Sequence, residues 1–205
     1  MPIRIILKRI DFMKKHILLI ISLFLGAVSF AQSRIIMDSI DPQTGTRAIG
    51  TSTMVVRSGL SDEHGIDLGL LAIQYEGQWS VRLRLSVCER ISHAIPKGAI
   101  LLVRTDAGEV FEFTNALDEL ESRDFRGTRS PNTGIVTYHN TGSYPVTIEQ
   151  LKEMAKGVAK IRVQLMSEVF DREYKQRDPF GEAIAEHLMV LGPAMAQNKD
   201  IRSDF

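Results

Sequence analysis

The chain has 205 residues, enough for one domain of ordinary size, and equal numbers of basic and acidic side chains, 25 of each. Its single cysteine, Cys88, excludes an intramolecular disulfide, so a hydrophobic core must supply the stability. The sequence contains no phosphate-cradling glycine loop, H-E-x-x-H motif or G-x-S-x-G motif, which excludes the enzyme classes that those motifs define.

Residues 13–31 have the three-part layout of a secretory signal peptide. Residues 14–16 form a basic head, an apolar run follows, and residues 29–31 place small side chains where a signal peptidase cuts. We therefore predict cleavage between Ala31 and Gln32. Residues 1–12 have no cap or turn pattern of their own, so we interpret them as a mis-assigned upstream extension.

Export changes the charge balance of the product. Residues 1–31 contain five basic side chains and one acidic, so the mature chain holds 20 basic and 24 acidic side chains, a net charge of −4. Nucleic acid and anionic membrane surfaces are bound mainly through basic residues, so neither is an expected partner. The apolar run is shorter than the roughly 20 residues that span a bilayer, which disfavours a membrane anchor. We expect a periplasmic or secreted protein with no stable membrane insertion after cleavage.

The clearest element is a β-hairpin predicted over residues 66–88. In residues 79–88, WSVRLRLSVC, large apolar side chains alternate strictly with smaller or charged ones, as in a strand with one buried and one solvated face. Residues 66–75 are apolar on both faces and predict a more central strand, and Gly77 supplies the turn. Trp79 belongs to the apolar set, so we expect it in the core rather than in a sugar-binding platform.

Further strands are predicted at short spacing along residues 32–193, which we expect to form a single β-rich domain. A second hairpin covers residues 99–113, with turns at its two ends. β-Branched and aliphatic runs predict other strands in residues 34–40, 47–57, 134–139 and 158–170. About eight strands joined mostly by turns predict a mainly β fold, an antiparallel β-sandwich with two short packed helices near the C-terminus.

The first predicted helix follows Thr147. Thr147 is a favourable N-cap, Gln150 is its reciprocal partner in a capping box, and Gly157 lies just past the expected end.

The second helix is predicted to begin after Asp178 as N-cap and to stop at Gly192 and Pro193. His187 lies on its apolar stripe, so we interpret it as a core or boundary histidine with a backbone partner. Residues 194–205 are expected to form a polar tail.

Four arginines are the candidate ligand-binding residues. Arg82 and Arg84 share the solvated face of the predicted strand, and Arg126 and Arg129 lie in a long loop predicted over residues 121–134. Guanidinium groups could bind a carboxylate, sulfate or phosphate on a ligand. The alternative is that these charges only keep a strand face solvated and discourage edge pairing.

Cys88 could act as a nucleophile with His93 as its base, but no other feature of a cysteine hydrolase surrounds the pair. An inert side chain near a strand end is the alternative that we favour, since a thiol nucleophile needs nearby positive charge. We therefore predict no catalytic residue.

Residues 61–67, SDEHGID, hold the densest group of potential metal ligands: Asp62, Glu63, His64 and Asp67. The twelve-residue calcium loop is absent, and the histidines are scattered along the chain, so an acidic turn is the favoured interpretation. We predict no metal site and no cofactor.

A leader followed by β-rich sequence such as KGAILLVRTDAGEVFEF is similar to exported β-rich bacterial proteins and implies no particular activity. We expect a non-catalytic binding or envelope structural module, with a protein or glycan at the cell envelope as its partner. Two alternatives stay open: a secreted hydrolase that uses acidic residues, and a secreted inhibitor that presents the loop at residues 121–134.

Overall fold

The computed structural model describes residues 33–56, 65–89, 94–117, 128–129, 136–175 and 177–197. The chain divides into two compact units, residues 1–32 and 33–205, and all described residues belong to the second. The predicted upstream extension and signal peptide thus lie outside the described residues. None of the described helices is both long and apolar enough to cross a bilayer.

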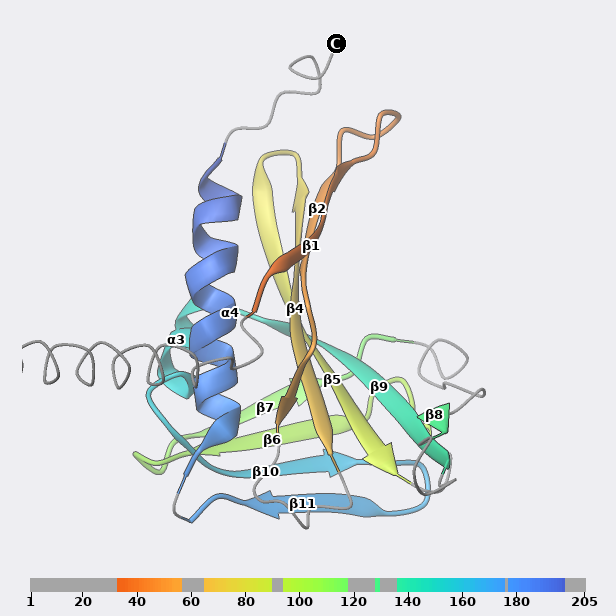
Figure 1. Ribbon diagram of the computed structural model, residues 1–205, viewed down its shortest axis with the longest axis vertical. Coiled ribbons are helices and arrows are strands. Elements are labelled where there is room, and N and C mark those ends of the chain that lie inside the picture. Colours follow the sequence, from red (N-terminus) through yellow and green to blue (C-terminus); the bar gives the residue numbers. More distant parts are fainter. Residues whose placement is uncertain are drawn as a thin grey trace, which may run out of the picture. The chain divides into compact units, whose positions relative to one another are not determined.

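Two antiparallel sheets account for most of the described residues (Figure 1). Sheet A has the order β1-β2-β4-β5-β9-β8, with β3 also paired to β4, and sheet B has the order β11-β10-β6-β7. The strands of sheet A are β1 (Ile35–Ile40), β2 (Arg47–Thr51), β3 (Met54–Val56), β4 (Ile66–Tyr75), β5 (Gln78–Glu89), β8 (Thr128–Arg129) and β9 (Val136–Val146). Those of sheet B are β6 (Ile100–Thr105), β7 (Val110–Thr114), β10 (Val158–Gln164) and β11 (Val169–Glu173).

The two sheets pack against each other, and the helices α3 (Ile148–Met154) and α4 (Pro179–Ala196) follow near the C-terminus. The predicted antiparallel β-sandwich is therefore confirmed. Eleven strands are described where about eight were expected, partly because residues 47–57 and 158–170 each form two strands. The first break lies between β2 and β3, where residues 51–53 stand opposite only two residues of β4, 69 and 70.

The predicted hairpin at residues 66–88 is confirmed as β4 and β5, which pair along the whole length of β4. Its turn residues Glu76 and Gly77 both have positive φ, 49° and 78°, the geometry that suits the right-handed twist of the flanking strands. Trp79 is half-buried and packs against the core, with the guanidinium of Arg47 5.9 Å from its ring centre.

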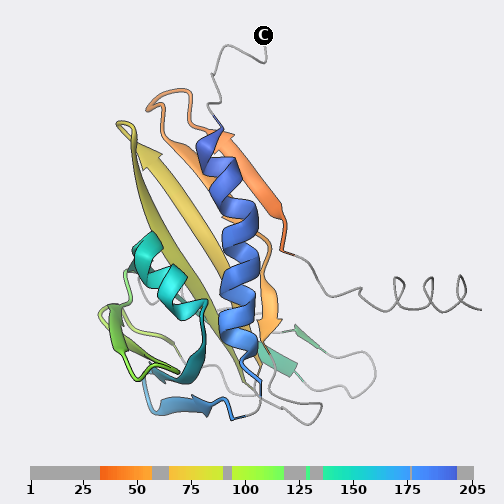
Figure 2. The same cartoon turned by 90° about the vertical axis from the view of Figure 1, so that its left-hand side faces the viewer.

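The core is one cluster that joins both sheets and both helices. Alternation along β5 buries Val81, Leu83, Leu85 and Val87 in this cluster, as the sequence pattern predicts. Figure 2 shows α4 along the strands of sheet A with α3 beside it. We call the face of sheet A that bears this core the inner face, and the opposite face the outer face.

The predicted start of α3 is confirmed. The Thr147 hydroxyl accepts a hydrogen bond from the Gln150 backbone N–H at 3.1 Å, and the Gln150 side chain accepts one from the Thr147 backbone N–H at 2.9 Å. Gly157 follows the helix with a φ of 152°.

The predicted stop of the second helix at Gly192 and Pro193 is wrong, because α4 continues to Ala196. Pro193 removes one helical hydrogen bond, but the last carbonyl groups find another donor. The Arg47 guanidinium donates to the carbonyl oxygens of Ala194 at 3.2 Å and Gln197 at 2.5 Å, and Asp38 holds it from the other side at 2.9 and 3.0 Å. A cation from β2 therefore caps the helix that local sequence would end earlier.

Candidate functional site

The outer face of sheet A carries two of the four candidate arginines. Arg82 and Arg84 lie on this face of β5, Arg82 half-buried and Arg84 exposed. Arg126 lies outside the described residues. Arg129 is placed in the short strand β8, but its side chain is also outside the description. The loop predicted over residues 121–134 is described only at Thr128–Arg129, so the structure brings only Arg82 and Arg84 together.

At one end of this face, three adjacent strands bring together the side chains of Asp67 on β4, Cys88 on β5 and His139 on β9. Cys88 and His139 are direct partners in the β5–β9 register, and Asp67 enters from the other neighbouring strand. The Cys88 Sγ lies 3.3 Å from His139 Nδ1 and 3.6 Å from Asp67 Oδ2, and Nδ1 and Oδ2 are 3.1 Å apart. We call these residues the Asp67–Cys88–His139 cluster.

The cluster lies close to the surface without being fully exposed. The exposed fraction is 7% for Cys88, 16% for the Asp67 side chain and 30% for that of His139. Gly65 borders the thiol: its carbonyl oxygen accepts a hydrogen bond from the Cys88 backbone N–H at 2.9 Å, and a Cβ added there would lie 3.9 Å from Sγ. A small ion or ligand atom could therefore approach the cluster from the His139 side.

The geometry does not suit a proton relay from thiol to carboxylate. In a relay of the Cys–His–Asp kind, one ring nitrogen of histidine faces the nucleophile and the other faces the carboxylate. Here both the thiol and the carboxylate contact the same atom, His139 Nδ1. His93, which the sequence offered as a base for Cys88, lies outside the described residues; the described histidine beside the thiol is His139.

The same geometry suits a metal ion. Tetrahedral zinc has bonds of about 2.3 Å to sulfur and about 2.0–2.2 Å to nitrogen and oxygen, which places its ligand atoms about 3.3–3.6 Å apart. The three separations in the cluster, 3.1 to 3.6 Å, need only small adjustments to surround such an ion. Each residue offers one ligand atom of a type that zinc accepts.

From the sequence alone we predicted no metal site, because the histidines are scattered. Asp67 was noted only with Asp62, Glu63 and His64, and these three lie outside the described residues. His139 was missed as a partner of Cys88 because the two are 51 residues apart. The sequence does carry one signal, because Cys88 and His139 each lie at a position of polar alternation in a predicted strand. The alternation does not show which strands pair, so it could not bring the two residues together.

His187 has a different environment, as predicted. Its Nε2–H donates to the carbonyl oxygen of Leu68 at 3.0 Å, so Nδ1 is the acceptor for the Ser33 hydroxyl at 2.5 Å. Burial of the ring lowers the pKa of His187 from 6.5 to about 4, so the ring is neutral at physiological pH. The expected backbone partner is confirmed.

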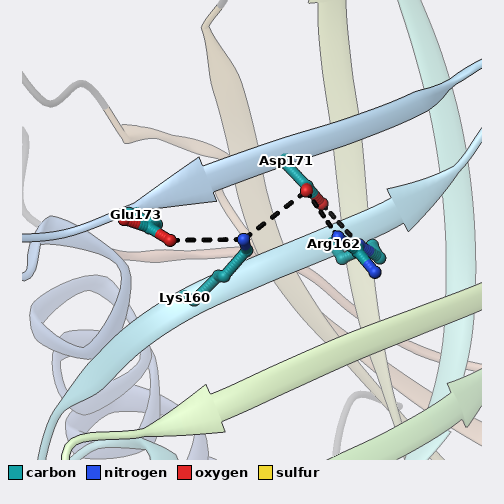
Figure 3. A network of polar contacts seen from close by, with 4 residues as sticks. All are labelled: Lys160, Arg162, Asp171 and Glu173. Carbon is teal, nitrogen blue, oxygen red and sulfur yellow. Dashed lines mark hydrogen bonds and ion pairs between the residues drawn. The ribbon is translucent and has the colours of Figure 1, made fainter.

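The outer side of sheet B carries a shallow depression of about 250 Å³ lined by Leu102, Arg104, Val110, Lys160 and Arg162. Two of its three cations are already paired. Figure 3 shows Lys160 between Asp171 and Glu173, at 3.5 and 3.3 Å, and Arg162 in a double hydrogen bond with Asp171 at 2.6 and 2.7 Å. These exposed pairs are of a kind that contributes little to stability, and they leave less positive charge for a ligand.

Comparisons of the chain with models of protein families, with curated proteins and with solved structures found no match. The Asp67–Cys88–His139 cluster is the strongest candidate, because three different ligand types from three strands meet at one point.

Proposed function

We propose that the chain is exported and that its mature domain is a module that binds one divalent metal ion at the Asp67–Cys88–His139 cluster. The observation that carries the proposal is the convergence of a thiol sulfur, an imidazole nitrogen and a carboxylate oxygen within 3.6 Å of one another. Export is supported by the leader-like layout of residues 13–31.

The ligand set favours zinc over magnesium or calcium. Magnesium and calcium prefer oxygen ligands, whereas a thiolate with an imidazole suits zinc and other transition metals. The described residues supply three ligands, and tetrahedral geometry has a fourth position that water or an external group could take. A site of this kind binds a further ligand rather than only cross-linking the fold.

The experiment is a measurement of bound metal. The full chain is expressed with its own leader, purified from the exported fraction and titrated with Zn²⁺ under native mass spectrometry. We expect one zinc per chain, and a product that begins at Gln32. Cys88→Ala and His139→Ala should each lower the zinc affinity by at least about 100-fold, since each removes one of the three ligands that the described residues supply.

Ser86→Ala is the matched control, because Ser86 stands on the same face two residues from Cys88 and supplies no ligand atom to the cluster. It should bind zinc like the natural chain. A natural chain that takes up no zinc, or variants that bind it unchanged, would contradict the proposal.

A metal-dependent hydrolase is the second candidate, favoured by the open fourth position. Zinc at a three-ligand site lowers the pKa of a bound water enough to make it a nucleophile. One assay distinguishes the two candidates. If the zinc-loaded protein hydrolyses p-nitrophenyl acetate faster than the Cys88→Ala variant does, the protein is an enzyme. If the two rates of hydrolysis are equal, the binding module is the candidate that remains.

A further inference from the structure

A polar strip leads from the candidate arginines to the Asp67–Cys88–His139 cluster. Arg82, Arg84, Ser86 and Cys88 are alternate residues of β5, so their side chains all lie on the outer face. Thr141 on β9 is the direct partner of Ser86, and their hydroxyl oxygens are 2.7 Å apart. The cluster lies at the end of this strip.

The strip offers hydrogen-bond donors and positive charge. Arg84 is exposed and forms no hydrogen bond or ion pair with any residue that the structure describes. In the Ser86–Thr141 pair one hydroxyl proton is used between the two oxygens, so the other can donate to a ligand. Among the described side chains of this face between Arg84 and the cluster, Asp67 is the one that carries a carboxylate. The metal ion would bind that carboxylate.

The spacing suits a small molecule with two ends. Arg84 and Cys88 are four residues apart on one extended strand, which separates their Cα atoms by about 13 Å. The Arg84 side chain is long enough to cover part of this distance, and a metal ion at the cluster would cover part at the other end. A short carbon chain fills what remains, with the hydroxyl pair beside it.

On the basis of the metal-binding function above, we propose that this strip binds a small organic dianion. One acidic group takes the open position on the metal ion at the Asp67–Cys88–His139 cluster, and the other pairs with the Arg84 guanidinium. A carboxylate or phosphate suits both ends, because each binds zinc through oxygen and accepts the paired N–H groups of arginine.

The test uses two probes that differ by one carboxylate. Glutarate has two and pentanoate has one on a chain of the same length, and each is titrated calorimetrically into the zinc-loaded mature protein. We expect glutarate to bind at least about tenfold more tightly, since a hydrogen bond between charged groups contributes that much. Arg84→Gln should abolish the preference and leave the zinc stoichiometry unchanged, because the side chain is exposed and distant from the cluster.

Arg104→Gln is the matched control, since Arg104 is also an exposed strand arginine but lies on sheet B. It should keep the full preference for glutarate. Equal affinity for the two probes, or an undiminished preference in Arg84→Gln, overturns the proposal while the zinc site stands. Failure of the natural chain to take up zinc, detected before any probe is added, overturns both.

Discussion

Strand β4 faces a histidine on each of its two sides, and the two histidines have opposite environments. On the inner side, His187 is fully buried, and its two ring nitrogens contact two different partners, Ser33 and the Leu68 carbonyl. On the outer side, His139 is 30% exposed, and one nitrogen is approached by both Cys88 and Asp67, the residue before Leu68.

The difference separates a structural histidine, His187, from a candidate binding histidine, His139. A ring whose two nitrogens each have their own partner is satisfied, and burial then keeps it neutral. A nitrogen shared by a thiol and a carboxylate has more neighbouring ligand atoms than a hydrogen-bond pair needs. The first arrangement ties Ser33 to α4 and β4. The second is the arrangement that we propose binds an ion.

The largest expected effect concerns His187 and pH. Between pH 6.5 and 4 the unfolded chain binds a proton at His187 and the folded chain does not, because burial lowers the folded-state pKa to about 4. The stabilisation is therefore complete above pH 6.5 and is lost as pH falls, by roughly 3 kcal/mol in all. Urea unfolding of the natural chain and of His187→Gln at pH 7 and pH 4 measures it.

Between pH 7 and pH 4, the free energy of unfolding of His187→Gln should fall by this much less than that of the natural chain. Other titrating groups contribute equally to both proteins and cancel in the comparison. Identical pH dependence in the two proteins would show that folding does not lower the pKa of His187, and the contrast with His139 would weaken.

The next effect concerns His139 and zinc. At a zinc concentration 100 times the Kd, the free energy of unfolding of the natural chain should rise by about 2.7 kcal/mol, because the ion binds only the folded state. His139→Ala should show no rise, and without zinc its stability should be within about 1 kcal/mol of the natural chain, since the ring is partly exposed. Thermal unfolding with and without zinc tests both statements. A large loss of stability in metal-free His139→Ala would make His139 a structural residue like His187.

The smallest effect concerns Asn140, the residue next to His139 on β9 but turned to the inner face. Its carboxamide is fully buried, and neither its oxygen nor its nitrogen has a hydrogen-bond partner in the structure described. Asn140→Leu should therefore raise the free energy of unfolding by about 1 kcal/mol, since it removes an uncompensated polar group. Chemical denaturation measures the change.

Asn115 is the matched control, because it is equally buried but hydrogen-bonded. Its carboxamide donates to the carbonyl oxygens of Ile95 and Pro96 and accepts from the Ser143 backbone N–H. Asn115→Leu should lower the free energy of unfolding by about 2 kcal/mol or more. A similar loss in Asn140→Leu would mean that Asn140 has a partner in solution.

Features that depend on neighbouring residues were predictable from the sequence. Alternation in residues 79–88 assigned the faces of β5 and hence the exposure of Arg84, Gly77 marked the hairpin turn, and Thr147 with Gln150 marked the start of α3. Each of these depends on side-chain direction, backbone φ or a cap within a few residues, which the local sequence specifies.

Features that depend on distant partners needed the tertiary structure. The pairing of β5 with β9 sets Cys88 opposite His139, and the position of β2 beside the end of α4 lets Arg47 extend that helix past Pro193. Many strand orders bury the same apolar faces equally well, so hydrophobic periodicity cannot choose which polar side chains meet on the other face. The sequence by itself determined most of the strands and their two faces, and the register between strands decided the candidate metal site.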